Sequence, residues 1–155
     1  MEKALISSIT MNDKIARISI LNVDNSPGKA FEIFSVLSKE NINIDIILQA
    51  GLNSDKKDII FTVSEDKLAE TVNILEKRFE GAYNIEYTQN VSKVSVTGSG
   101  MINRPGILSD VLEAVESVFI DIQMISSSEM SISLIIDKND AAKAAAALRN
   151  KFGAV

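Results

Sequence analysis

Hydrophobic and polar positions change their period along the chain in an order that occurs twice. Apolar side chains recur at helical spacing from Ala30 to Leu37, a pattern that predicts a helix with one buried face. Every second residue is then apolar from Ile42 to Leu48, which predicts a strand. We therefore expect a loop, a helix and a strand within residues 22–49, and we expect the rest of the chain to be organised around this segment.

The loop before this helix combines capping residues with a Pro-Gly pair. Asp24, Asn25 and Ser26 can each cap a helix, Pro27 suits the first helical position, and Gly28 lets a ligand approach the backbone. The beginning of a helix has free N–H groups and the positive end of the helix dipole, which together suit a small carboxylate. A single Pro-Gly pair is more commonly a helix-start signal alone, so the evidence for a binding loop depends on what surrounds it.

The pattern recurs 78 positions later, where Pro105-Gly106 repeats Pro27-Gly28. After the hairpin that follows each copy, the offset falls to 73, because the first copy carries five more residues in the polar stretch 51–58. The chain is therefore expected to contain two homologous units. The offset of 78 also matches Ile44 with Ile122 and Ile47 with Ile125.

Each unit is expected to be α+β, with the ferredoxin-like order βαββαβ and helices on one face of an antiparallel sheet. The elements predicted for the first unit are residues 15–21, 27–40, 43–50, 59–63, 64–79 and 84–89. Those predicted for the second unit are residues 93–97, 105–117, 120–126, 130–136 and 139–152. The phenylalanines at helical spacing are expected to pack in the cores: Phe31, Phe34, Phe79 and Phe152.

The second unit ends one strand short, while a strand predicted at residues 4–11 has no place in the first unit. We expect this N-terminal strand to complete the second sheet, because the edge of that sheet would otherwise be exposed. The predicted domains are therefore residues 15–90, and residues 1–14 together with 91–155.

Composition excludes several classes of function. Among 155 residues there are no cysteines and no histidines, which excludes disulfides, thiolate nucleophiles, zinc clusters and Ser-His-Asp triads. The net charge of −5 gives no electrostatic footprint for nucleic acid. No apolar run approaches the ~20 residues of a membrane span, and no secretory signal is recognisable at the N-terminus. We expect a cytoplasmic protein without a metal or other cofactor.

Several segments, taken in order, resemble the paired ACT domains at the regulatory end of aspartate kinase. They are SPGKAFEIFSVLSKENINIDIILQ, DIIFTV, KVSVTGSGM, RPGILSDVLEAV and SSSEMSISLII. The resemblance covers the whole chain and implies a tandem ferredoxin-like fold in which the N-terminal strand joins the second unit. It includes no kinase module, which implies a separate regulatory subunit or a regulatory fragment without catalytic activity.

The resemblance implies feedback sensing of threonine or lysine in clefts between ACT units of a homodimer that associates with a catalytic kinase subunit or domain. Backbone N–H groups near Gly28 would take the α-carboxylate, Asp45 or neighbouring carbonyls the ammonium, and Gln49 a side-chain hydroxyl or amine of the ligand. Carried over by position, the effector-binding residues are Asn25, Gly28, Ala30, Asn43, Asp45 and Gln49 in the first unit, with Leu108, Asp121 and Ile122 in the second.

The chain departs from the family pattern in its binding loops. Asn25 stands where the family usually has Asp, and Asp121 stands where it usually has Asn. The second loop reads Asn103-Arg104 where a Ser-His pair is typical. The departures leave the identity of the bound amino acid open.

Three alternatives remain open from the sequence. The first is a stand-alone amino-acid sensor for another enzyme. The second is a scaffold whose clefts are vestigial and which strengthens assembly of the kinase. The third is a ferredoxin-like enzyme of the acylphosphatase type. The last needs an arginine in a phosphate-cradling loop with an asparagine nearby, for which Arg104 and Asn103 are the candidates. Asp45, taken alone, also suits a solvated strand residue or a guard on a sheet edge.

Overall fold

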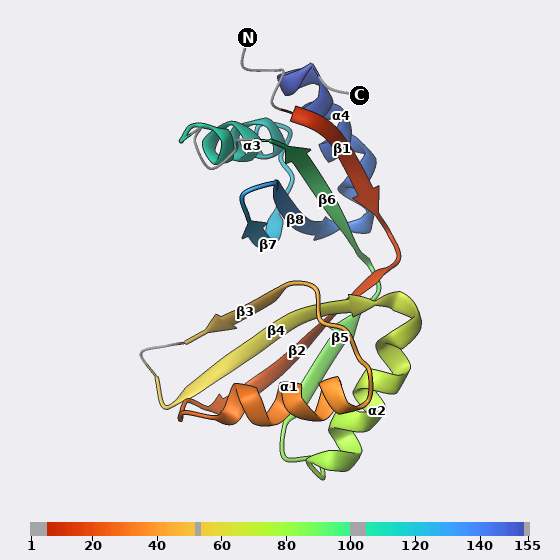
Figure 1. The fold of residues 1–155 in the computed structure, drawn as a ribbon, viewed down its shortest axis with the longest axis vertical. Coiled ribbons are helices and arrows are strands. Elements are labelled where there is room, and N and C mark those ends of the chain that lie inside the picture. The colour runs from red at the N-terminus through yellow and green to blue at the C-terminus, as the bar shows by residue number, and fades with distance from the viewer. Residues whose placement is uncertain (1–5, 52–53, 100–104, 154–155) are drawn as a thin grey trace. The chain divides into compact units, whose positions relative to one another are not determined.

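A computed structural model describes residues 6–51, 54–99 and 105–153 of the chain (Figure 1). The chain divides into two compact units. We call Lys14–Gln89 the first unit, and Met1–Asp13 together with Asn90–Val155 the second unit. Each unit contains a four-stranded sheet in which all neighbouring strands are antiparallel.

The sheet of the first unit has the strand order β3-β4-β2-β5. One hydrophobic core joins residues of both helices to β2 and β4, so both helices cover the same face of the sheet (Figure 1). The elements in chain order are β2 (Ile15–Asp24), α1 (Lys29–Lys39), β3 (Ile47–Ala50), β4 (Lys56–Ser64), the 3₁₀ turn Glu65–Lys67, α2 (Leu68–Arg78) and β5 (Asn84–Thr88).

The second unit has the corresponding strand order β1-β6-β8-β7, with its own core between sheet and helices. Its elements are β1 (Ile6–Asn12), β6 (Val91–Gly98), α3 (Ile107–Glu116), β7 (Ile122–Ser127), β8 (Ser131–Asp137), the 3₁₀ turn Lys138–Asp140 and α4 (Ala141–Phe152). The predicted fold class, two ferredoxin-like units with antiparallel sheets, is confirmed.

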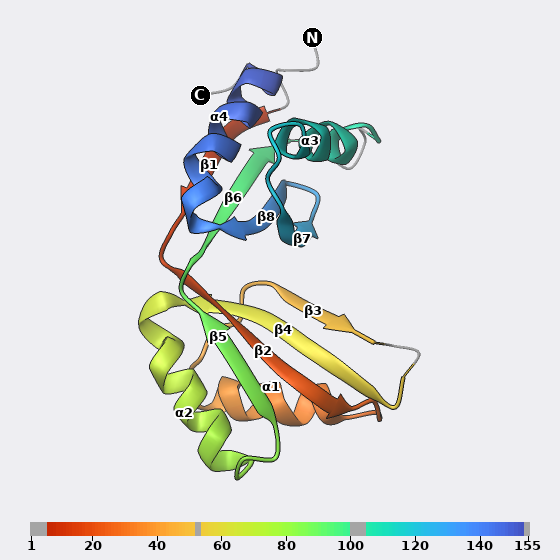
Figure 2. The ribbon, with the colours of Figure 1, turned by 180° about the vertical axis from the view of Figure 1, so that it is seen from behind.

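The N-terminal strand completes the second unit, as predicted. β1 pairs antiparallel with β6, with Ile9 opposite Val96, and the two strands lie side by side in both views (Figure 1 and Figure 2). Ile6 and Ile9 are buried in the core of that unit, and the Arg149 side chain of α4 donates a hydrogen bond to the Ile9 carbonyl at 3.2 Å. The first unit is therefore inserted between two segments that belong to one sheet.

The predicted helix caps are wrong. Helix α1 begins at Lys29, after Gly28 at φ 94°, and no side chain caps it. The Asp24 carboxylate instead forms an ion pair with Lys56 of the neighbouring strand β4, and does not cap the helix. Ser64 likewise makes no capping hydrogen bond, because a 3₁₀ turn precedes α2.

Phe31 is not in the core, contrary to the prediction, since 77% of its side chain is exposed. The sheet-facing side of α1 carries Ile33 and Leu37, both fully buried, and Ala30 lies on the same side by its spacing. Phe31 follows Ala30 by one position, so its side chain is turned ~100° away from the sheet. The other three phenylalanines were predicted correctly. Phe34 packs edge-to-face on Phe61 with ring centroids 5.3 Å apart, Phe79 packs against the first core, and Phe152 is buried in the second.

The strand predicted at residues 43–50 begins later, at Ile47. Before it, Asp45 and Ile46 both lie opposite Thr62: the Asp45 N–H donates to the Thr62 carbonyl at 3.1 Å, and the Thr62 N–H donates to the Ile46 carbonyl at 3.0 Å. Two residues facing one is a β-bulge, which interrupts the ladder. The predicted alternation therefore ends at Ile46, and Leu48 is 41% exposed on the edge strand.

Candidate functional site

The first group of predicted site residues lies in the loop between β2 and α1. Asn25 is half-buried, and its backbone N–H donates to the Asp55 carbonyl at 2.9 Å. Its side-chain Nδ2 also donates to the Ser54 carbonyl at 3.0 Å. These two hydrogen bonds hold the loop against the residues that lead into β4.

Gly28 ends this loop in a left-handed conformation that side chains rarely adopt. A Cβ at Gly28 would meet no atom within 4 Å, so the glycine is needed for its backbone angles and the space beside it is open. Its carbonyl accepts the Glu32 N–H at 2.9 Å, the first hydrogen bond of α1. Ala30 lies half-buried one residue into the helix. The first N–H groups of α1 therefore face an accessible surface, as an anion site requires.

The charged neighbours of this loop are engaged with each other. Lys56 donates a hydrogen bond to the Asp24 carboxylate. This hydrogen bond and the positive charge of Lys56 hold the Asp24 pKa below its ordinary value. The same hydrogen bond and the negative charge of Asp24 raise the pKa of Lys56. Lys29, the first residue of α1, likewise pairs with Glu32 at 3.7 Å. Because the charges of both lysines are compensated, a carboxylate bound at the loop would depend mainly on backbone N–H groups.

The second group of predicted site residues follows the outer edge of the same sheet. Asn43, Asp45 and Gln49 all have exposed side chains. Gln49 lies on β3 opposite Ile59, and the Asp45 backbone is tied to Thr62 at the bulge. These three residues therefore offer polar groups along one edge of the first unit.

A single first unit does not bring the two groups together. The loop residue Asn25 contacts β4 at its beginning, beside Asp55, while Asp45 contacts β4 near its end, at Thr62. Seven residues of extended strand separate these two levels, which corresponds to about 23 Å. Gln49, opposite Ile59, lies nearer to the loop, about 13 Å along the strand from the level of Asp55. One amino acid cannot span the distance between Asn25 and Asp45, so a site that uses both needs a second surface.

In the second unit, Leu108 and Asp121 lie at opposite ends of α3. Leu108 is 40% exposed in the first turn of this ten-residue helix, which is about 15 Å long. Asp121 is exposed and Ile122 half-buried where β7 begins. A shallow depression of about 410 Å³ is lined by Glu116, Phe119, Ile120, Asp121 and Ile122.

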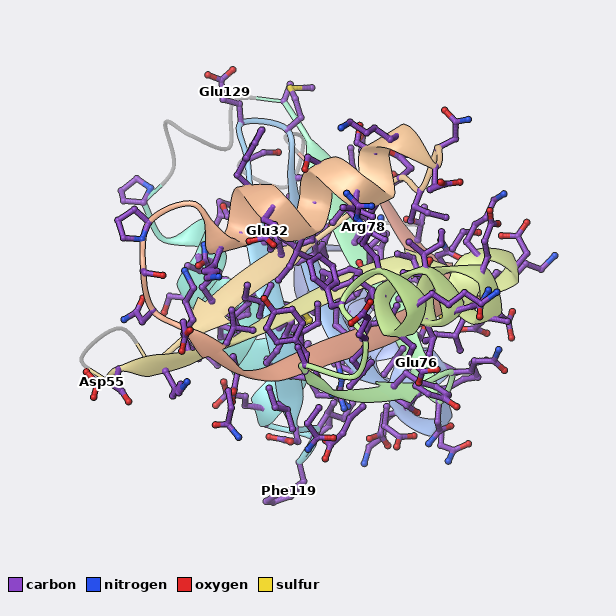
Figure 3. All side chains as sticks on the ribbon, turned by 90° about the horizontal axis from the view of Figure 1, so that it is seen from below. Glu32, Asp55, Glu76, Arg78, Phe119 and Glu129 are labelled. Carbon is purple, nitrogen blue, oxygen red and sulfur yellow. The ribbon has the colours of Figure 1, made fainter. Side chains whose placement is uncertain are left out.

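Phe119, beside this depression, was not predicted from the sequence. Its side chain is 95% exposed and projects away from the ribbon (Figure 3). Its backbone is left-handed at φ 62°, as is that of the corresponding residue of the first unit, Asn41, at φ 60°. Asparagine tolerates this conformation and a bulky aromatic residue rarely adopts it. The offset of 78 residues, which aligns Phe119 with Asn41, could have predicted the left-handed turn from the sequence. The offset does not indicate that the Phe119 side chain is exposed.

A groove of about 460 Å³ on the first unit contains none of the predicted site residues. Figure 3 shows the Arg78 side chain between α1 and α2, where this groove lies. Lys39, Lys77 and Arg78 belong to the last turns of their helices, where cations complement the helix dipole. Their positions are thus explained without a ligand. The lining residues are Val36, Lys39, Glu40, Asn73, Ile74, Lys77 and Arg78.

Residues 6–51, 54–99 and 105–153 offer neither a metal-binding cluster nor a membrane-spanning helix. These residues contain no group of three His, Cys, Asp or Glu side chains that could hold a metal ion. Over the same ranges, no helix is long and apolar enough to cross a membrane. Asn103 and Arg104, the candidates for acylphosphatase chemistry, lie outside the described residues.

Comparison with known families decides what this pair of units is. A family model described as "ACT domain" matches residues 18–79 and 94–152, one match in each unit. This chain belongs to the ACT domain family. Because the model matches each of the two units once, the internal repeat found in the sequence is a tandem of two ACT domains.

Aspartate kinases are among the known proteins similar to the tandem ACT chain. An aspartokinase of Geobacillus stearothermophilus is 34% identical over 149 residues, covering 96% of this chain and 36% of that relative. The ligand-free regulatory subunit of aspartate kinase from Thermus thermophilus superimposes with a TM-score of 0.91 at 27% identity, covering 96% of this chain and 99% of that one. A structure of aspartokinase alpha and beta subunits gives 0.88 at 31% identity, with the same coverage of both chains. The ACT chain thus spans little more than a third of the curated relative's length, and resembles a regulatory subunit throughout.

Proposed function

We propose that this chain is the non-catalytic regulatory part of an aspartate kinase and acts in the cytoplasm. It binds threonine or lysine and transmits its occupancy to a catalytic kinase subunit or domain as feedback inhibition. The observation that carries the proposal is the match to a regulatory subunit over nearly the full length of both chains, with a TM-score of 0.91. The catalytic activity and its substrates belong to a part that the described residues do not contain.

The proposed effector site combines the β2–α1 loop with the edge of β3. The first N–H groups of α1, near Gly28 and Ala30, take the α-carboxylate, and Asp45 takes the ammonium group. Asn25, Asn43 and Gln49 contribute polar contacts. The corresponding positions of the second unit are Leu108, Asp121 and Ile122.

The proposed site is completed by a second copy of the chain. Asn25 and Asp45 lie about 23 Å apart along the strand direction, so one unit does not assemble both around one ligand. All four residues of the edge strand β3 are exposed, including Ile47 at 48%, and Phe31 on α1 is 77% exposed. Exposed apolar side chains beside an open strand edge favour pairing of ACT units in a homodimer.

Regulation then follows from differential binding. An amino acid held between units of two chains favours whichever arrangement of those units fits it more tightly. Its effect on the kinase cannot exceed the difference between its binding free energies to the two arrangements.

A thermal-shift titration with threonine and with lysine tests the proposal. At 100-fold its dissociation constant, an effector stabilises the folded chain by roughly 2.7 kcal/mol, which raises the melting temperature by roughly 5–10 °C. We expect a saturable shift with one of the two amino acids, and none with alanine at equal concentration. Melting that is insensitive to both threonine and lysine would contradict binding by this chain.

Asn25→Asp tests the loop. From the sequence alone this change is expected to alter ligand affinity and leave folding nearly untouched. In the structure the Asn25 amide donates to Ser54, and a carboxylate cannot donate, so we expect a loss of about 0.5–1.5 kcal/mol in unfolding free energy as well. Urea denaturation measures this loss and calorimetry the affinity. Asn25→Ala, which removes the hydrogen bond without adding charge, separates the two effects. Unchanged affinity in both variants would remove Asn25 from the site.

A further inference from the structure

The bulge that carries Asp45 is held by one residue, Thr62. Its carbonyl and N–H form hydrogen bonds with the backbones of Asp45 and Ile46, and its hydroxyl Oγ1 accepts a third hydrogen bond, from the Ile46 N–H at 3.1 Å. Three hydrogen bonds from one residue thus fix two consecutive residues of the segment between α1 and β3. Asn43, the other polar residue of the proposed site in this segment, lies two positions before Asp45.

The hydroxyl is the decisive group, because a bulge leaves one N–H without a ladder partner. Thr62 is fully buried and Ile46 is 6% exposed, so water does not readily replace the missing acceptor. A buried N–H group that loses its acceptor is strongly disfavoured. If Thr62 lost its hydroxyl, the Ile46 N–H would lose this acceptor, and we expect the segment that carries Asp45 to be held less firmly even where the bulge itself is kept.

The second unit shows that the bulge itself does not require this hydroxyl. There the register moves from Ile122 opposite Ile136 to Met124 opposite Ile135, so two residues again face one. The residue at the Thr62 position is Ile135, which is fully buried and has no polar side-chain atom. The two units share the bulge, and only the first has a hydroxyl acceptor at this position.

We propose that Thr62 is a positioning residue of the amino-acid site: through the bulge it holds Asn43 and Asp45 in the orientation that binds the ligand. This inference rests on the proposed function. It also makes the two units unequal, because the edge of the second unit lacks the corresponding hydroxyl. Thr62 itself is buried and does not contact the ligand; it acts through the segment that carries Asn43 and Asp45.

Thr62→Val and Thr62→Ser in the full chain test this proposal. Valine keeps the shape of threonine and lacks the hydroxyl, whereas serine restores it. We expect Thr62→Val to weaken binding of the active amino acid, threonine or lysine, on the order of tenfold, with recovery in Thr62→Ser. Amide hydrogen exchange at Ile46 should be faster in the valine variant and return toward the wild-type rate in the serine variant.

A matched control is Thr71→Val in the same unit. Thr71 is also fully buried, and its hydroxyl donates to the Lys67 carbonyl at 2.6 Å within the first turns of α2. This control also loses a buried hydroxyl, and should bind with wild-type affinity. Wild-type affinity in Thr62→Val, or equal weakening in Thr71→Val, would overturn the positioning role and leave the proposed function standing. A wild-type chain that binds neither threonine nor lysine would instead refute the proposed function.

Discussion

Removal of residues 1–12 is expected to unfold the second unit. This deletion takes away β1, which pairs with β6 over its whole length and buries Ile6 and Ile9 in the core. Burial of these two side chains contributes about 1.5–3 kcal/mol each, a large share of the roughly 4–12 kcal/mol expected for a unit of this size. The deletion also exposes β6 as a new sheet edge, which favours aggregation.

Urea denaturation followed by circular dichroism measures this effect. A synthetic peptide of residues 1–12 added to the truncated chain should restore part of the lost signal, because the missing strand can pair with β6 again. Met11→Ala is the control on the same strand, since Met11 is 44% exposed, and it should change unfolding free energy by less than about 0.5 kcal/mol. A truncated chain that unfolds like the full-length chain would contradict the role of β1.

Phe61→Ala should cost about 3–5 kcal/mol of unfolding free energy. Phe61 is fully buried on β4 between two neighbouring strands, and Phe34 packs edge-to-face on its ring. Alanine would leave a cavity that the surrounding sheet and helix cannot readily close. The measurement is urea denaturation at low protein concentration, where association between copies contributes little.

Phe31→Ala is the matched control, with the same change of side chain in the same unit. Because Phe31 is 77% exposed, we expect its replacement to change unfolding free energy by less than about 0.5 kcal/mol. The same variant should weaken association between copies if α1 contributes to the homodimer. A Phe31→Ala chain as unstable as Phe61→Ala would show that the core of the first unit is not where the structure places it.

The elements and the repeat were accessible from sequence because they depend on local patterns. Helical spacing in α1 and α4 and alternation in β8 follow from burial of one face, which the order of residues records directly. The missing strand of the second unit was found by counting elements in the two copies. The same counting located the five additional residues of the first unit within the stretch 51–58.

The misplaced features depend on contacts between segments distant in sequence. Asp24 is a good cap by residue type, but pairing of β4 with β2 places Lys56 opposite it, and the carboxylate pairs with that cation. The β3 boundary was misplaced because the bulge is made by Thr62, sixteen residues after Ile46. Phe31 was misassigned because helical spacing alone does not show how much of the helix circumference the sheet covers.

The sequence by itself determined that two α+β units repeat, that the N-terminal strand belongs to the second, and which residues resemble an amino-acid site. Only the tertiary structure decided that the loop and edge groups lie at different levels of the first sheet, and that a buried hydroxyl holds the edge group. The physical reason is that periodicity records which face of each element is buried. The distance between Asn25 and Asp45 depends instead on strand register, which hydrogen bonds between distant segments establish.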